Sequence, residues 1–360
     1  MRRFESSRPS QATQDFISLK LSDIGEFRLI SSIRSDVKDF QREVIVGIGD
    51  DTAAIEVSGE KLLLFTSDSL VEDIHFKWNY ASPFQVGWKA LAVNISDIAA
   101  VGGNPTYCLI SLALPTHTER NLIREVYRGL KKAAARYGVG IVGGDTVRAP
   151  SFIITVSLLG EVKRENIVLR SEAKPGDLIY VTGNLGSSGA GLACLKAPNW
   201  KVKSKIRQFL IKRHLMLSPR LVEGQKIASS QIATSMIDLS DGLASDLHRL
   251  AEESKVGAVL WEDELPIAPP TEELAKVMGK SLLEWVLYGG EDYELLFTVP
   301  ANKRKKVEQT LGFPHVLIGE IVDKDQGIYL RNRKGNRTKI EDRGYNHFST
   351  STKLKKPKIN

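Results

Sequence analysis

The sequence is poor in the residues that stabilise small secreted proteins and build zinc sites. It has two cysteines and six histidines among 360 residues, and Cys108 and Cys194 lie far apart. A disulfide framework is therefore not expected, and we predict a reducing, cytoplasmic environment. Because histidine and cysteine form no cluster along the chain, zinc is not the expected metal.

Long apolar runs are also missing. No run approaches the ~18 residues of a membrane-spanning helix. The basic N-terminus, MRRFESSRPSQATQDF, has no apolar core of the kind that a secretory signal requires. We expect neither a membrane span nor a signal. The hydrophobic content of 42% and the charged content of 26% are ordinary for a folded protein, and the length suggests two domains.

Positive charge is in modest excess and is unevenly placed. The formal net charge is +7, and much of it lies in RNRKGNRTK and in the tail KLKKPKIN. A basic tail can bind nucleic acid, which gives one alternative function. No aromatic residues alternate with the lysines and no nucleic-acid motif accompanies them, so we favour a solvated tail.

Short β-branched runs alternate with helical patterns along the chain. The first half contains strand-like EVIVG, KLLLFT, TYCLISLAL and FIITVSLLGEV, with helices expected over 84–101 and 120–137. The second half contains strand-like DLIYVTG, ATSMIDL, ELLFTVP and HVLIGEIV. It also contains a helix in SDGLASDLHRLAEES, for which Ser240 or Asp241 is the expected N-cap.

A polar Lys-Pro-Gly-Asp turn in RSEAKPGDLIYVTG indicates a domain boundary near residue 165. We therefore predict two mixed α/β domains flanked by two terminal segments. The predicted parts are an extended segment at 1–23, an N-terminal domain at 24–164, a C-terminal domain at 165–348 and a basic tail at 349–360.

Three glycine-rich stretches are candidates for phosphate binding. Gly138-Val-Gly140-Ile-Val-Gly143 matches the dinucleotide fingerprint but follows a helix instead of a strand, so we discount it. GKS at 279–281 lacks the first glycine of a P-loop, because position 274 is leucine. TGNLGSSGAG, at 182–191, lies between a strand and a helix, where an anion-binding loop and a plain turn are equally favoured.

The placement of acidic residues is more informative. Many of them stand in or at the end of apolar segments, where an unpaired charge is costly. They are Asp51, Asp68, Asp97, Asp145, Asp238, Asp241, Glu291 and Asp292. A cap, a turn or an ion pair explains any single one, but the repeated pattern with adjacent glycines favours a shared ligand. Carboxylates beside hydroxyls suit Mg²⁺, and Mg²⁺ shared with phosphate oxygens implies a nucleotide site.

The chain resembles the thiamine-monophosphate kinase family. The resemblance covers residues 24–348 and is carried, in order, by GIGDDTAAI, TSDSLVEDIHF, KALAVNISDIAAVGGNP, GIVGGDTVR, RSEAKPGDLIYVTG, IDLSDGLASDL and YGGEDYELLFTV. GGEDYEL with SLVEDIHF and KALAVN is specific to this kinase. The surrounding superfamily also includes aminoimidazole ribonucleotide synthetase, selenophosphate synthetase and a hydrogenase-maturation factor.

The resemblance implies a fold and a reaction. The N-terminal α/β domain would contribute strands to a barrel across a homodimer, and a C-terminal α/β domain would follow. ATP and several Mg²⁺ ions would bind between the domains, and ATP would phosphorylate thiamine monophosphate to thiamine diphosphate. The attacking phosphate oxygen is already ionised at neutral pH, so we predict no general base.

The resemblance also implies site residues by motif position. The implied metal ligands are Asp51, Thr66, Ser67, Asp68, Asp97, Asp145, Asp238 and Asp241. The implied ATP contacts are Tyr127, Gly144, Asp145, Arg170 and Ser240, and the implied thiamine contacts are His75, Glu291 and Tyr345. Taken singly, some have simpler interpretations: Tyr127 as a core residue, Arg170 as a surface charge and Tyr345 as a pin for the C-terminus.

The sequence leaves four alternatives to this kinase. Selenophosphate synthetase would need a reactive cysteine near the N-terminus, where neither Cys108 nor Cys194 lies. Another ATP-dependent synthetase of the superfamily, with a different acceptor, is the nearest alternative. A non-catalytic homologue is disfavoured because all the motif aspartates are present, and a nucleic-acid-binding protein would leave the acidic residues unexplained.

Overall fold

The computed structural model describes residues 21–36, 43–197, 200–345 and 347. The chain divides into two units, Met1–Phe40 with Asn346–Asn360, and Gln41–Tyr345. In the first unit, helix α2 (Leu21–Asp36) is kinked at Gly25, where φ is 72°. Residues 1–20 of the predicted N-terminal segment and the predicted basic tail lie outside the described residues. Every other helix and strand of the described residues belongs to the second unit.

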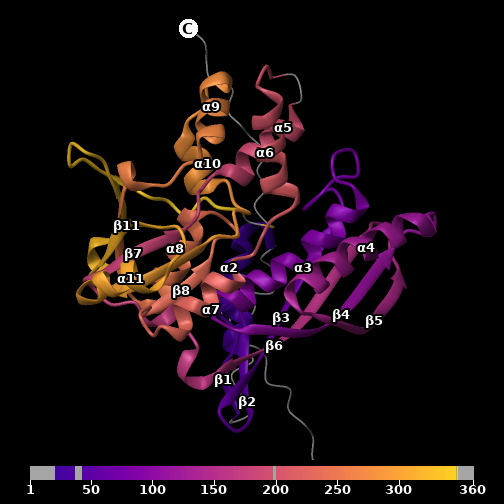
Figure 1. The fold of residues 1–360 in the computed structure, drawn as a ribbon, viewed down its shortest axis with the longest axis horizontal. Coiled ribbons are helices and arrows are strands. Elements are labelled where there is room, and N and C mark those ends of the chain that lie inside the picture. Colours follow the sequence, from indigo (N-terminus) through magenta and orange to yellow (C-terminus); the bar gives the residue numbers. More distant parts are fainter. Residues whose placement is uncertain (1–20, 37–42, 198–199, 346, 348–360) are drawn as a thin grey trace, which may run out of the picture. The chain divides into compact units, whose positions relative to one another are not determined.

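The first half of the second unit is a six-stranded mixed sheet in the order β1-β2-β3-β6-β4-β5 (Figure 1). Only the β4–β5 pair is parallel within this sheet. Its strands are β1 (Val44–Val46), β2 (Ala53–Ser58), β3 (Lys61–Val71), β4 (Asn104–Leu114), β5 (Gly140–Arg148) and β6 (Ile153–Lys163). Its helices are α3 (Pro83–Ala100) and α4 (Arg120–Tyr137).

Helix α3 is apolar around almost its whole circumference because it is covered on all sides. It begins with a capping box between Ser82 and Gln85 and a proline at its first turn. It packs on β3 and β6 of the first sheet, and also against α7 and β8 of the second half of the unit. Gly87 lets α4 approach closely, since a Cβ there would lie 1.9 Å from the carbonyl oxygen of Val126.

The second half is a seven-stranded sheet in the order β13-β12-β9-β11-β7-β10-β8. Its strands are β7 (Asp177–Thr182), β8 (Ser235–Asp238), β9 (Gly257–Trp261), β10 (Leu295–Pro300), β11 (His315–Val322), β12 (Ile328–Arg331) and β13 (Arg337–Lys339). Its helices are α5 (Ser187–Lys196), α6 (Ser204–Leu215), α7 (Leu221–Ser229), α8 (Leu243–Ser254), α9 (Pro269–Met278), α10 (Leu282–Tyr288) and α11 (Arg304–Thr310).

Both faces of the second sheet are buried. Alternate residues of a strand point to opposite faces. Ile179 and Val181 of β7 pack with α8 and α10, whereas Tyr180 packs with α7 and α11. The near-continuous apolar runs of the second half follow from this two-sided burial.

Within the described residues of the second unit, helices cover one face of the first sheet only. The side chains of β3, β4 and β6 that point away from α3 include Phe65, Tyr107 and Leu109, which are 39%, 56% and 48% exposed. Beside them lie hydroxyls, and the Oγ of Ser67 is 3.0 Å from that of Ser157. This sheet face is therefore apolar, with a polar strip, and no described helix of the second unit packs on it.

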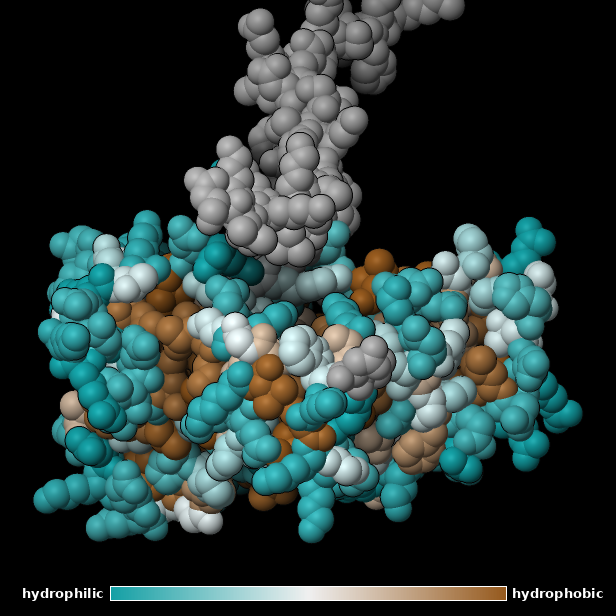
Figure 2. All heavy atoms as spheres, turned by 90° about the horizontal axis from the view of Figure 1, so that it is seen from above, coloured by the Kyte–Doolittle hydropathy of each residue, from teal (hydrophilic) through white to brown (hydrophobic). Residues whose placement is uncertain are grey.

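Figure 2 shows one face of the molecule, on which hydrophobic residues adjoin one another in the left half of the view and are bordered by hydrophilic ones. Apolar atoms make up a large share of the surface of any folded protein. No helix within the described residues is long and apolar enough to span a membrane.

The observed helices and strands agree with most of the local structure predicted from the sequence. The helices expected at 84–101 and 120–137 are confirmed as α3 and α4, and two mixed sheets confirm the mixed α/β class. The N-cap predicted for α8 was wrong, because α8 begins at Leu243 and its cap is Gly242, with φ of 109°. Strand β3 also runs past the expected KLLLFT to Val71. The predicted domain boundary near residue 165 stays a prediction.

Candidate active site

Three carboxylates meet where α3 passes between the two sheets. Asp51 precedes β2, Asp97 lies on α3 and Asp238 ends β8. One ligand atom from each lies within 4.8 Å of the others, and Asp51 and Asp238 are buried. Like charges at this spacing repel strongly, so the arrangement calls for a counter-charge.

The protonation of this triad reflects its crowding. Burial, and then the charges of Asp68 and Asp238, raise the pKa of Asp97 well above its ordinary value. Burial and the charge of Asp51 do the same for the pKa of Asp238. Two hydroxyls partly satisfy the carboxylates: Thr66 Oγ1 donates to Asp97 at 2.5 Å, and Ser96 Oγ donates to Asp238 at 2.6 Å. An oxygen-only donor set of this kind fits a hard divalent cation such as Mg²⁺.

Arg170 supplies positive charge at the edge of the triad. It lies in the short helix η2 (Arg170–Glu172), and its Nε donates to Asp51 Oδ2 at 3.0 Å while Nη2 binds the other oxygen. Its backbone N–H donates to Asp50 at 3.1 Å. Burial, together with the charge of Asp51, raises the pKa of Asp50 to about 6. The interpretation of Arg170 as a solvated surface charge is wrong, since its side chain is 14% exposed.

Asp241 is held in a second acidic group. Its carboxylate pairs with Arg249, which also binds Asp246 at 3.0 Å. The buried Asp246 accepts the backbone N–H groups of Asp241 and Gly242, each at 3.1 Å. Asp246 thus fixes the turn that enters α8, beside Ser240 and Asp241, the expected N-cap residues.

Glu291 organises a third group. Its carboxylate binds the ammonium of Lys89 at one oxygen and lies 3.2 Å from His214 Nδ1 at the other. Although burial opposes it, the charge of Lys89 lowers the pKa of Glu291, and His214 and His75 act in the same direction. The backbone N–H of Glu291 donates to the carbonyl of Ser240 at 2.6 Å. Glu291 therefore lies beside the Ser240 backbone and within electrostatic reach of His75, and its ion-pair partner Lys89 was not expected from the sequence.

Gly144 and Asp145 lie three strands away from Asp68 in the first sheet. Across the first sheet, Asp68 pairs with Val156, Val156 with Ile110, and Ile110 with Gly144. At about 4.8 Å per strand, Gly144 is roughly 14 Å from Asp68. The neighbouring Asp145 is exposed on the same edge strand, β5.

The other predicted site residues, Ser67, Tyr127 and Tyr345, lie in different surroundings. Ser67 points to the face opposite that of Thr66 and Asp68, because the three lie in succession within β3. Tyr127 of α4 is partly buried against the first hydrophobic core. Tyr345 is 46% exposed, and its N–H donates to the carbonyl of Asp241 at 3.4 Å.

The glycine-rich stretch at 182–191 binds a carboxylate of the same chain. It joins β7 to α5, and the Asp292 carboxylate accepts the N–H groups of Gly186 at 2.5 Å and Ser188 at 3.0 Å. A helix N-terminus attracts a negative charge. The chain's own Asp292 fills that role here, which favours the interpretation of a structural turn.

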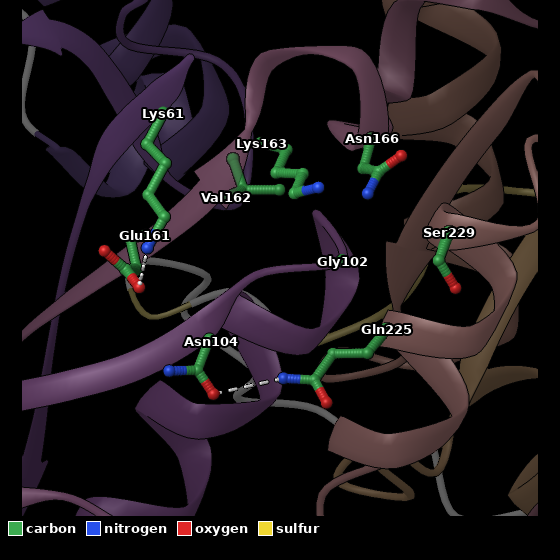
Figure 3. Close-up of a pocket in the computed structure, with 9 residues that line it drawn as sticks. All are labelled: Lys61, Gly102, Asn104, Glu161, Val162, Lys163, Asn166, Gln225 and Ser229. Atoms are coloured by element: carbon green, nitrogen blue, oxygen red, sulfur yellow. Dashed lines mark hydrogen bonds and ion pairs between the residues drawn. The ribbon is translucent and has the colours of Figure 1, made fainter. Parts of the chain in front are cut away.

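A separate pocket of about 280 Å³ lies near the other end of β3 (Figure 3). Lys61 and Glu161 pair across one wall at 2.6 Å, and Gln225 donates to Asn104 at 3.3 Å. None of the predicted site residues is among the nine that line it. Its polar groups are thus partly satisfied by each other, and the acidic triad is a distinct feature.

Comparison with known proteins places this geometry in a family. The N-terminal and C-terminal domain models of the AIR synthase related proteins match residues 49–162 and 174–330. The thiamine-monophosphate kinases of Bacillus subtilis (strain 168) and Escherichia coli (strain K12) are each 38% identical to the chain. They cover 90% and 91% of this chain, and 99% of each relative is matched.

A solved structure gives the same result. AaThiL complexed with AMPPCP and TMP superposes with a TM-score of 0.81 at 35% identity, covering 92% of this chain and 99% of that one. The predicted two-domain synthetase fold is thereby confirmed. The chain belongs to the thiamine-monophosphate kinase family of AIR synthase related proteins.

Proposed function

We propose that the chain transfers the γ-phosphoryl group of ATP to thiamine monophosphate, giving ADP and thiamine diphosphate. Relatives that bear the name of this kinase match nearly the whole chain. The observation in the chain itself that best supports the proposal is the triad of Asp51, Asp97 and Asp238. Phosphoryl transfer between two polyanions depends on positioning and charge neutralisation, which such a site provides.

The triad suits Mg²⁺, and we propose that Asp51, Asp97 and Asp238 hold it, with Thr66 and Asp68 beside them. When bound, Mg²⁺ neutralises charge on the phosphate oxygens and so reduces the repulsion between donor and acceptor. The number of Mg²⁺ ions bound at one time stays a prediction, and so does metal ligation by Ser67, Asp145 and Asp241. Asp51 and Asp97 belong to the first half of the unit, and Asp238 belongs to the second. The triad therefore stays assembled only while the two halves remain in contact along α3.

The chain's other charged residues have complementary roles in this proposal. Arg170 presents a planar guanidinium at the triad, which suits a phosphate contact. Glu291 is kept ionised by Lys89, and a carboxylate in that state suits the cationic thiazolium or the amino group of thiamine. Contacts from Tyr127, Gly144 and Ser240 to ATP, and from His75 and Tyr345 to thiamine, stay predictions.

We also propose a homodimer, formed through the uncovered face of the first sheet. Phe65, Tyr107 and Leu109 make that face apolar, and contiguous exposed apolar surface is typical of association sites. The same face carries the side chain of Ser67. A cytoplasmic location is proposed as well, in keeping with two unpaired, buried cysteines.

The test is an ADP-release assay with Mg-ATP and one of three acceptors: thiamine monophosphate, free thiamine, or none. Chromatography identifies the product. Thiamine diphosphate formed only from the monophosphate supports the proposal, and ATP turnover without a thiamine product contradicts it. Asp97→Asn is the matched variant, because it keeps the shape of the side chain and removes its charge. It should lose most of the turnover.

A further inference from the structure

Lys89 is a buried ammonium in an otherwise apolar stretch of α3. Its side chain is 3% exposed, and its Nζ contacts Glu291 Oε1. A buried lysine is costly unless it is paired, so this contact accounts for its charge. The pair also links the two halves of the unit, because α3 belongs to the first half and Glu291 precedes β10 of the second half.

Glu291 has little freedom of its own. Its φ is 58°, a left-handed conformation that is uncommon for a residue with a side chain. Its backbone N–H is bound to the carbonyl of Ser240. Lys89 takes one carboxylate oxygen and His214 Nδ1 lies 3.2 Å from the other. Both the backbone and the head group of Glu291 are therefore fixed.

Of the two partners, Lys89 carries the charge. His214 is 2% exposed and its Nδ1 also lies 3.0 Å from Ser188 Oγ. Burial, and then the charge of Lys89, lower the pKa of His214 to about 4. At neutral pH its imidazole is uncharged and can only share a hydrogen bond with Glu291. The ion pair that holds the carboxylate is Lys89–Glu291.

We propose that Lys89 is a positioning residue for the thiamine end of the site: it holds Glu291, from the other half of the unit, in the orientation that receives the acceptor. The inference rests on the proposed function, since Glu291 is the residue proposed to contact thiamine. Lys89 acts through Glu291, and it contacts neither the triad nor the phosphates. Its loss should therefore weaken the acceptor and spare ATP.

The experiment measures KM for thiamine monophosphate and for ATP separately, in the wild type and in Lys89→Met. Lys89 is buried and the Glu291 side chain is 26% exposed, and truncating one partner of such a largely desolvated, hydrogen-bonded charge pair changes affinity by about tenfold or more. We expect the acceptor KM to rise by that factor while the ATP KM stays within about twofold. Any other pattern, including an equal rise in both or no rise, overturns the inference.

The matched control is Lys61→Met, which removes a lysine from an exposed Lys–Glu pair of the first sheet. Exposed pairs contribute little, so both KM values should match the wild type. Thermal unfolding reports whether each variant folds.

If Lys89→Met does not fold, the double variant Lys89→Met/Glu291→Gln is compared with Glu291→Gln alone, because removing both charges avoids an unpaired one. Equal acceptor KM values show that Lys89 acts only through Glu291, and a further rise in the double variant overturns the inference. A wild type that makes no thiamine diphosphate overturns the proposed function first. A wild type that does so, with an unchanged acceptor KM in Lys89→Met, overturns this inference alone.

Discussion

Arg170 and Asp51 form a two-point ion pair that joins η2, just before the second sheet, to the loop just before β2 of the first. Arg170 Nε donates to one carboxylate oxygen at 3.0 Å, and Nη2 binds the other. The Asp51 side chain is 1% exposed. The pair thus fixes one corner of the triad and places a positive charge beside it.

Arg170→Met should destabilise the chain when no divalent cation is present. Removing one partner of a buried pair leaves an uncompensated charge, at a cost of roughly 3–5 kcal/mol. Saturating MgCl₂ should recover part of this loss, because a cation at Asp51 supplies the missing charge. Urea denaturation with and without Mg²⁺ measures both effects.

The control for that experiment is Arg164→Met. Arg164 pairs with Glu56 at 2.6 Å, but both side chains are 46% exposed. A solvent-exposed ion pair contributes about 0–1 kcal/mol to stability. The free energy of unfolding of this variant should therefore be close to that of the wild type. An equal loss in the two arginine variants would contradict the special role of Arg170.

Stability without divalent cations should fall as pH rises. Asp97 and Asp238 have folded-state pKa values above the ordinary carboxyl value, so the folded chain binds protons that the unfolded chain has released. Their contribution is present below the ordinary carboxyl pKa and is lost as pH rises through the raised pKa. Asp50, whose pKa is raised to about 6, acts in the same direction. Thermal unfolding in EDTA across about pH 5 to 8 measures this slope.

Two comparisons identify the source of that slope. Asp97→Asn should flatten it and raise the melting temperature at the alkaline end, because one of the mutually repelling carboxylates is gone. Saturating Mg²⁺ should also flatten it in the wild type. A slope that is the same in Asp97→Asn and in the wild type would show that the triad is not its origin.

Leu109→Glu should shift the proposed dimer toward monomer. Leu109 is 48% exposed on the uncovered face of the first sheet, and a buried, unpaired carboxylate at a dimer contact is costly. Sedimentation equilibrium measures the change. Val222→Glu, at a 74% exposed position on α7, is the control and should leave association unchanged. A monomeric wild type would contradict the dimer directly.

Local pattern was enough to predict α3 and α4, because the apolar stripe of α4 and the length of α3 are visible in sequence. The start of α8 was not predictable in the same way. The cap residues favoured by composition, Ser240 and Asp241, give way to Gly242, whose φ of 109° suits glycine, while Asp246 binds the free N–H groups. Residue propensity identifies polar residues near the start of a helix, but tertiary contacts decide which side chain accepts the backbone N–H groups there.

The candidate site likewise has features that the sequence predicts and features that only the folded structure shows. Its acids were identified from their apolar surroundings, and Asp51, Asp97 and Asp238 do meet. The opposite orientations of Thr66 and Ser67 depend on β3 continuing through them, which the short apolar run did not indicate. Lys89 was missed although it is a lone lysine among apolar residues. Its partner is 202 residues away, and a single sequence does not show such pairing.

Glu294→Gln should be among the more destabilising single changes in the second half of the unit. The Glu294 side chain is fully buried and accepts four hydrogen bonds. Arg213 Nη2 and Arg220 Nη2 donate to Oε1 at 2.6 and 2.7 Å, and Arg220 Nε and Thr182 Oγ1 donate to Oε2 at 2.5 and 2.7 Å. Glutamine would turn an amide NH₂ toward donors and remove the charge that two arginines require.

The expected loss for Glu294→Gln is roughly 3–5 kcal/mol in the free energy of unfolding, measured by urea denaturation. Glu161→Gln, in the exposed pair with Lys61, should lose no more than about 1 kcal/mol. The two variants make the same chemical change, so the difference between them isolates burial. If both cost the same small amount, the two arginines must find other partners or water at that position. The Glu294 cluster would then not be what anchors α6 and the entry to α7 against β10.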